Sequence, residues 1–216
     1  MVAREASAPP QNQRELTESW EARILAAGLP VAWTEAATPR PRISFGAPLP
    51  VGMAAHGELI DIVLVERWPT WRVREGLSGV LPAGWRLIDL GDVWLAGPPL
   101  AGRVAAADYR ISLGPDAPDA PALASACKTL VGASALPRER QKGDGMVRYD
   151  LRPLLVDVGV AATGPPVVLR TRTRIHPELG SGRPEEVVAA LADAAGVALE
   201  IASIERERLV LADDLE

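Results

Sequence analysis

Arginines alternate along one apolar segment in the last quarter of the chain. In residues 167–175 (VVLRTRTRI), Arg170, Arg172 and Arg174 occupy every second position. The segment is rich in β-branched residues and predicts a strand, and the alternation places all three guanidinium groups on one face of it. A guanidinium group binds phosphate or carboxylate through two parallel hydrogen bonds. This face is therefore a candidate anion-binding surface.

A second alternation precedes the first. Residues 148–158 also predict a strand, and Arg148, Asp150 and Arg152 share one face of it. If the two strands form a hairpin in even register, five guanidinium groups and one carboxylate meet on one open face of a sheet. The alternative is a solvated face on which the arginines pair with Asp150 and with the glutamates of residues 205–208. The sequence leaves both hypotheses open.

A proline-stiffened turn carries two further arginines. Arg40 and Arg42 flank Pro41, an arrangement that suits either a binding loop or the solvated end of a strand. Glu58 and Asp61 follow at a spacing of three. On one strand that spacing directs their side chains to opposite faces, which argues against a paired-carboxylate acid–base site.

The cysteine and the two histidines provide little evidence for a catalytic or metal-binding site. Cys127 is the sole cysteine, so the chain cannot form an internal disulfide or a cysteine-ligated cluster by itself. Its apolar neighbours on a predicted helix favour a buried residue over a nucleophile. His56 and His176 lack ligands at metal-binding spacing. We expect no cofactor and no metal site.

All six tryptophans lie between residues 20 and 94. Four of them cluster about a predicted helix and the strand after it: Trp68, Trp71, Trp85 and Trp94. They could form a platform on which nucleic acid bases stack. Packing in a core or between modules is the other interpretation.

The order of predicted elements indicates an α+β fold with an internal repeat. In the first half we expect a helix at 15–27, strands at 42–49 and 58–65, a helix at 71–80 and a strand at 85–95. In the second half we expect a strand at 107–113, a helix at 119–131, strands at 148–158 and 167–175, a helix at 184–195 and a strand at 199–211. The second half reads β-α-β-β-α-β, which predicts a ferredoxin-like module. Two such modules in tandem, at residues 14–97 and 104–212, account for the chain.

The first module lacks an opening strand, or has a degenerate one. Residues 1–13 (MVAREASAPPQNQ) are small, polar and proline-containing, so we expect them to be disordered or weakly structured. An opening strand is central in such a sheet, so its slot must be filled. The candidates are residues 1–13 themselves, direct pairing of the flanking strands, or a strand from a second chain. We expect the first or the second, because residues 2–8 could form a short strand.

Several short motifs resemble the radical-SAM-linked proteins, a bacterial family of unknown function. The resemblance rests on the segments at 39–45 and 48–52, on Lys142-Gly143, on residues 150–154 and on residues 183–186. Members are fused to, or encoded beside, a B12-binding-type radical SAM protein. The resemblance therefore implies a radical SAM partner that carries the chemistry, since this chain lacks the three-cysteine motif. It also implies proximity to genes for ribonuclease E/G and ribosomal proteins. Gln13-Arg14-Glu15 stands where the family has a His-Leu-Asp triplet.

Composition narrows the classes of function. The net charge of −5 argues against a protein that coats nucleic acid with its whole surface, although a local basic patch remains compatible with it. No signal-like segment or long apolar run is found, so we expect a cytoplasmic protein without a membrane partner. Three hypotheses follow: a non-catalytic companion of a radical SAM system, an RNA- or anion-binding module, and, ranked last, an enzyme with a cleft between modules that uses arginines with Asp61 or Asp150.

Overall fold

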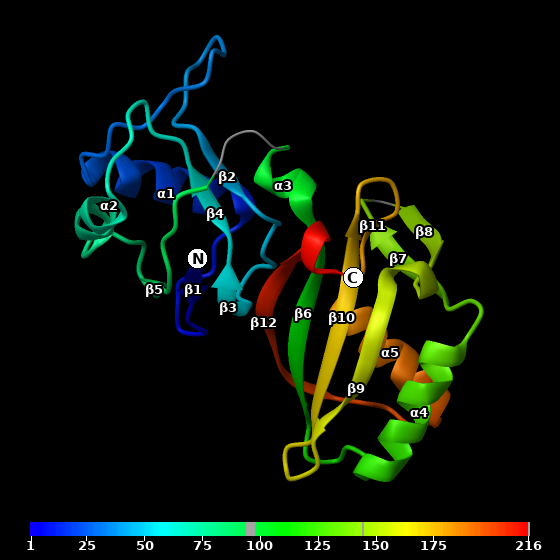
Figure 1. The fold of residues 1–216 in the computed structure, drawn as a ribbon. Helices are drawn as coiled ribbons and strands as arrows, with labels where there is room; N and C mark the ends of the chain where they lie inside the picture. Colours follow the sequence, from blue (N-terminus) through cyan, green and yellow to red (C-terminus); the bar gives the residue numbers. More distant parts are fainter. Residues whose placement is uncertain (94–97, 144, 216) are drawn as a thin grey trace. The chain divides into compact units, whose positions relative to one another are not determined.

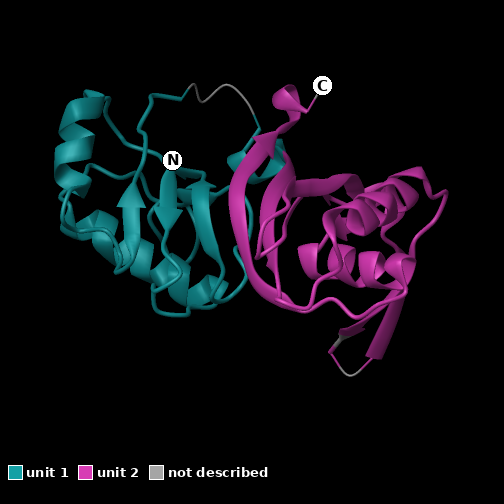
Figure 2. Cartoon of the chain, turned by 90° about the horizontal axis from the view of Figure 1, so that it is seen from below, with its two compact units in different colours: residues 1–104 teal, residues 105–216 magenta. Residues whose placement is uncertain are grey.

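The computed structural model describes residues 1–93, 98–143 and 145–215 (Figure 1). The chain divides into two compact units, Met1–Val104 and Ala105–Glu216 (Figure 2). Each contains helices and strands, so the α+β class is confirmed. Trp94, Gly97 and the end of the strand predicted at 85–95 lie outside the described residues. Within the described part, no helix is both long and apolar enough to span a membrane.

The first helix, α1 (Gln13–Ala26), shows how the local sequence sets an element. Asn12 caps it, and its Oδ1 accepts hydrogen bonds from the backbone N–H groups of Arg14 and Glu15 at 3.0 Å. The Glu15 carboxylate accepts from the Asn12 N–H at 2.9 Å, which completes a capping box. Leu16, Trp20 and Ile24 form a buried stripe at helical spacing.

The sheet of unit 1 has the order β3–β1–β5, with β1 at Val2–Arg4, β3 at Ala54–Glu58 and β5 at Trp85–Leu87. Two more strands, β2 (Ile43–Phe45) and β4 (Ile60–Ile62), pair with each other. The helices α2 (Thr70–Leu77) and α3 (Leu100–Arg103) complete the unit. The strand predicted at 58–65 is divided, so Glu58 lies in β3 and Asp61 in β4.

The start of the chain forms a strand although its composition indicated disorder or weak structure. Val2, Ala3 and Arg4 are 2–4% exposed, and β1 pairs antiparallel with β3 on one side and β5 on the other. The slot of the opening strand is thus occupied by the chain itself. The Arg4 guanidinium is buried with it and donates hydrogen bonds to the carbonyl groups of Met53 at 2.7 Å, Pro9 at 3.0 Å and Ala8 at 3.2 Å.

The sheet of unit 2 has the order β9–β10–β6–β12, so its opening strand β6 is also central. These strands are β6 (Val104–Leu113), β9 (Leu155–Ala162), β10 (Val168–His176) and β12 (Ile201–Leu211). The pairings of β10 with β6 and with β9 are antiparallel. A short strand, β11 (Gly180–Ser181), pairs with the end of β10.

Two helices cover one face of this sheet (Figures 1 and 2). The first, α4 (Ala120–Gly132), begins after Asp119, whose carboxylate accepts from the Ala122 N–H at 3.0 Å, and the second, α5 (Pro184–Ala195), ends at Gly196 in the left-handed conformation. Both helices are confirmed. Their apolar faces pack on alternate residues of the strands, and the fully buried side chains there include Leu123, Leu130, Val187, Leu191, Ile111 and Leu169.

The strand predicted at 148–158 is interrupted, because residues 151–154 are not part of a strand. Gly145–Asp150 is β8, which pairs with β7 (Pro137–Lys142) in a separate hairpin. A single turn of 3-10 helix, η1 (Arg152–Leu154), then precedes β9. Pro153 explains the break, because its fixed φ and missing N–H suit a helical turn better than the interior of a strand. The β7–β8 hairpin projects from unit 2 in Figure 2 and was not predicted.

Candidate anion-binding site

The three alternating arginines of β10 do share a face. Leu169, Thr171 and Thr173 are buried on the opposite face, under the helices, while Arg170 and Arg174 are exposed and Arg172 is half-buried. The spacing of residues in the sequence therefore predicted this local geometry correctly. Whether these arginines can bind an anion depends on the residues of the strands on either side of β10.

The neighbours of β10 are different from those predicted. Arg172 lies opposite Asp108 of β6 on one side and Asp157 of β9 on the other. Arg148 lies in the β7–β8 hairpin and Arg152 in η1, so neither stands beside Arg170 on an adjacent strand. The hairpin that would bring five guanidinium groups onto one face therefore does not form.

Asp108 binds two arginines at the centre of this face. Its two carboxylate oxygens accept from Nε and Nη2 of Arg172 at 2.6 and 2.9 Å, and Oδ2 also accepts from Nε of Arg208 at 2.8 Å. Burial raises the pKa of Asp108, but the hydrogen bonds from Arg172 and Arg208 outweigh burial and hold that pKa below its usual value. The carboxylate is thus charged at neutral pH and neutralises much of the face.

The ion pairs of Asp108 should make the stability of the protein depend on pH in the acid range. Because the folded-state pKa of Asp108 is lowered, its contribution to stability is present above the unfolded-state value of about 3.9 and is lost as pH falls through the folded-state pKa. We expect Asp108→Asn to melt below the wild type at pH 7, and we expect the gap to shrink towards pH 2.5. Thermal melts across that range measure it. A gap that is constant with pH would contradict the assignment.

Arg170 and Arg174 differ in their partners. Nη2 of Arg170 contacts Oε1 of Glu207 at 3.1 Å. No carboxylate partner is found for Arg174 among the described residues. Most of the face thus follows the solvated, ion-paired interpretation. Arg174 remains available as a cation, as does Arg110 of β6, which lies opposite Arg170 and has no ion pair among the described residues.

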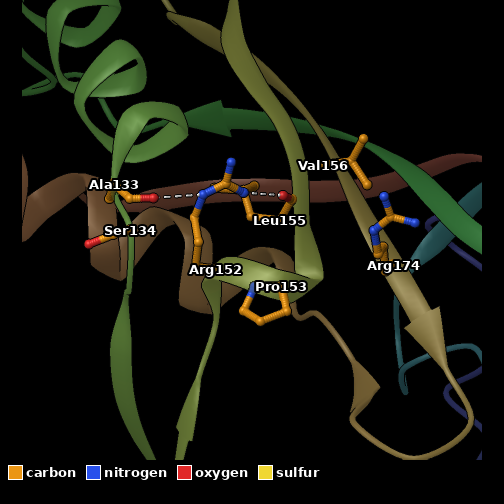
Figure 3. A pocket seen from close by; sticks show the side chains of 7 residues that line it. All are labelled: Ala133, Ser134, Arg152, Pro153, Leu155, Val156 and Arg174. Atoms are coloured by element: carbon orange, nitrogen blue, oxygen red, sulfur yellow. Dashed lines mark hydrogen bonds between the residues drawn. The ribbon is translucent and has the colours of Figure 1, made fainter.

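Arg174 lines a hollow of about 470 Å³ together with Arg152 (Figure 3). We call this the arginine hollow. Arg174 comes from β10 and Arg152 from η1, and Ser134 and Val156 also contribute to the lining. The two guanidinium groups are 22 residues apart in sequence, and the fold brings them to one surface depression.

The Arg152 guanidinium is fixed by backbone carbonyl groups. Its Nε, Nη1 and Nη2 donate to the oxygens of Ala133 at 3.0 Å, Leu155 at 2.7 Å and Val131 at 2.8 Å. Two of these carbonyls belong to the C-terminal end of α4, where a cation is favoured by the helix dipole. Three of its five N–H groups are used in this way, so two remain for a ligand.

The other predicted site arginines lie apart from the hollow. Arg148 pairs with Glu139 at 2.5 Å on the β7–β8 hairpin. In unit 1, Arg40 pairs with Glu21 at 2.8 Å, and Arg42 is exposed. The sequence analysis missed Asp108, Arg208 and Ser134. Asp108 lies on the polar face of an alternating segment (AADYRISL), but its pairing with Arg172 depends on a strand register that the sequence does not reveal.

The other candidate residues from the sequence are the tryptophans, Cys127 and the metal-ligating residue types. Trp85 packs edge-to-face on Trp20 with ring centroids 5.5 Å apart, and the Arg72 guanidinium lies 3.6 Å from the centroid of Trp68. Trp71 is 65% exposed, and Trp94 lies outside the described residues. Burial raises the pKa of the Cys127 thiol to about 11, which keeps it protonated at neutral pH. No group of three metal-ligating side chains occurs in the described part of the chain.

Comparisons with known proteins identify a family for this chain and a solved structure with a similar fold. A model of a bacterial family described as "Uncharacterized protein conserved in bacteria (DUF2344)" matches residues 12–189. No curated protein matches. Among solved structures, a chain of a Cbf5-Nop10-Gar1 complex is similar with a TM-score of 0.54 at 10% identity, over 96% of this chain and 48% of that one. The chain thus spans about half the length of that protein, and the likeness concerns the fold alone.

Proposed function

Since the chain belongs to the DUF2344 family of bacterial proteins, whose function is uncharacterised, we propose a role from its geometry: a non-catalytic companion domain that binds phosphate groups of RNA at the arginine hollow. One observation carries the proposal. Arg174, which has no carboxylate partner in the described residues, lies at the same depression as the fixed guanidinium of Arg152.

The chemistry of the hollow suits a phosphate group. A phosphate has several acceptor oxygens, and the free N–H groups of two arginines can bind more than one of them. Arg152 is held in place before the ligand arrives, so little conformational entropy is lost when it binds. The Ser134 hydroxyl is exposed at the rim and adds a further donor. RNA is the favoured ligand because an open, arginine-bearing sheet face is a recurrent RNA-binding surface of small α+β modules.

The ion-paired arginines give a matched control. We expect Arg174→Ser to lower the affinity for a single-stranded oligoribonucleotide roughly tenfold at 0.1 M salt, and to reduce the slope of log K against log salt by about one. Arg170→Ser, on the same strand and the same face, removes a guanidinium group already paired with Glu207. It should change both quantities much less. Fluorescence anisotropy at several salt concentrations measures them.

Two outcomes would refute the proposal. If Arg174→Ser and Arg170→Ser weaken binding equally, the hollow has no special role and the whole face acts only as diffuse charge. If neither variant changes the affinity or the salt slope, the arginines serve only to solvate the sheet.

A radical SAM partner is a separate proposal. It is supported by the resemblance of residues 39–52, 142–143, 150–154 and 183–186 to radical-SAM-linked proteins. Affinity purification of the tagged chain from its native host tests it. Recovery of a radical SAM protein in stoichiometric amount would support the partnership, and its absence from repeated purifications under anaerobic conditions would refute it.

We also propose that both units are ferredoxin-like modules. In unit 2, the order β9–β10–β6–β12 with two helices on one face suits that topology, apart from the inserted β7–β8 hairpin. In unit 1, β1 is central between β3 and β5 and plays the part that β6 plays in unit 2. Superposition of the two units on their central strands and helices in a crystal structure would support this proposal. Unrelated strand orders in the two units would refute it.

A further inference from the structure

A second hollow, of about 900 Å³, lies between the β7–β8 hairpin and α5. We call it the hairpin hollow. Arg138 and Tyr149 face each other across the hairpin pair and line the hollow from one side, and Glu186 and Ala189 of α5 line it from the other. None of these residues belongs to the arginine hollow.

Two buried polar atoms of this hollow have no hydrogen-bond partner among the described residues: Nε of Arg138 and Oη of Tyr149. The rest of the Arg138 guanidinium is held by an ion pair of 2.6 Å between Nη1 and Oδ2 of Asp193. A buried donor without an acceptor is unfavourable. Two of them beside one hollow leave a place for an acceptor group.

The opposite wall offers the complementary group. No hydrogen-bond donor to the Glu186 carboxylate is found within the described part of the chain. Burial raises the pKa of Tyr149, and the nearby Glu186 carboxylate raises it further, so the phenol remains a hydrogen-bond donor at neutral pH. These three groups offer the hairpin hollow two donors and one acceptor, and the charged side chains of Glu139, Arg148 and Asp150 also line it.

Apolar and aromatic groups lie beside these polar groups. The Arg140 guanidinium lies 4.9 Å from the centroid of the Tyr149 ring, and Ala135, Pro137 and Ala189 line the hollow as well. Unstacked RNA bases bind to such surfaces, on aromatic rings and guanidinium planes, while their edges form hydrogen bonds.

We infer that the hairpin hollow binds an RNA base with an amide edge, uracil or guanine; this rests on the proposed function. Uracil and guanine carry a carbonyl acceptor next to a ring N–H donor, which matches the donors of Arg138 and Tyr149 and the carboxylate of Glu186. Adenine and cytosine present an amino group where these bases have the carbonyl. Because Oη and Nε are buried, the hairpin shifts slightly from α5 as the base enters.

The two hollows are adjacent along the chain. Ser134 and Arg152 line the arginine hollow, and Ala135 and Asp150 line the hairpin hollow. Consecutive Cα atoms are about 3.8 Å apart, so the two sites are within reach of neighbouring groups on one strand of RNA. A phosphate at Arg174 and a base at Tyr149 can belong to the same short oligonucleotide.

Hexamers of U, G, A and C ribonucleotides test the inference by fluorescence anisotropy. To keep the G hexamer single-stranded, the titrations use lithium buffer. For the wild type we expect U and G to bind at least roughly fivefold more tightly than A and C, about the loss of one hydrogen bond. Tyr149→Phe and Glu186→Gln should remove the preference and leave the affinity for A and C unchanged. Glu185→Gln, the neighbouring exposed glutamate of α5, is the matched control and should keep the preference.

The outcomes separate this inference from the proposed function. Equal binding of all four hexamers, with an affinity that still depends on Arg174, overturns the base site alone. A preference that persists in both Tyr149→Phe and Glu186→Gln also overturns it. Failure of every hexamer to bind overturns the phosphate site and the base site together. Thermal melts of the variants must match the wild type, which excludes misfolding as the cause of a lost preference.

Discussion

Deletion of residues 2–8 is expected to abolish the cooperative folding of unit 1. These residues include β1, which pairs on both sides, and the Arg4 guanidinium, which bonds to the carbonyl groups of Met53, Ala8 and Pro9. Each buried backbone group left without a partner costs about 1–3 kcal/mol. In a domain of 60–100 residues, 1 kcal/mol corresponds to a fall in melting temperature of about 4–8 °C. Several such losses exceed what a small unit can tolerate.

Tryptophan fluorescence measures this effect in unit 1 specifically, because all six tryptophans lie between residues 20 and 94. We expect the deletion variant to emit at the wavelength of exposed tryptophan at room temperature. Glu5→Ala, a change at an exposed position beside the strand, should leave the emission and its melting transition unchanged. If the deletion variant keeps a buried emission and melts as a dimer, a strand from a second chain has replaced β1.

Substitution of Arg152 by Ala is expected to destabilise unit 2 by about 2–4 kcal/mol, in line with the loss of several hydrogen bonds from a charged donor. Three carbonyl oxygens, those of Val131, Ala133 and Leu155, lose their donor at once. The C-terminal end of α4 also loses a favourable cation. Chemical denaturation followed by far-ultraviolet circular dichroism measures the change.

Arg148→Ala is the matched control for this experiment, because Arg148 is an exposed arginine of the same segment with a surface ion pair. It should change the stability by less than about 1 kcal/mol. Arg152→Lys should fall between the two, since one ammonium group cannot reach three carbonyl groups in a fixed fork. Equal stability of Arg152→Ala and Arg148→Ala would show that the three hydrogen bonds contribute nothing measurable.

The sequence predicted those elements whose signals are local. The limits and apolar positions of α1, α4 and α5 each depend on a few adjacent residues, and all three helices form close to the expected ranges of 15–27, 119–131 and 184–195. The alternation of arginines on β10 is local in the same sense. Their common face is therefore confirmed.

Other features were not predicted, most of them because they depend on distant pairing. The β7–β8 hairpin and η1 replaced a single predicted strand, because Pro153 and a turn at Gly143 outweigh the apparent alternation of residues 148–152. The strand Val2–Arg4 is hidden in a polar segment, and only the unpaired edges of β3 and β5 make it favourable. Likewise, Asp108 becomes the partner of Arg172 and Arg208 only through the strand register. The hypothetical face of five arginines does not form for another reason, because residues 148–152 do not belong to a strand beside β10.

The Asp108 cluster also constrains when unit 2 can finish folding during synthesis. Asp108 and Arg172 are 64 residues apart, and Asp108 and Arg208 are 100 residues apart. Until β12 has left the ribosome, one edge of β6 is unpaired and Asp108 can bind Arg172 but not Arg208. A nascent chain that stops short of residue 208 therefore exposes the central strand of its sheet to other chains. Completion of this unit therefore depends on its last strand.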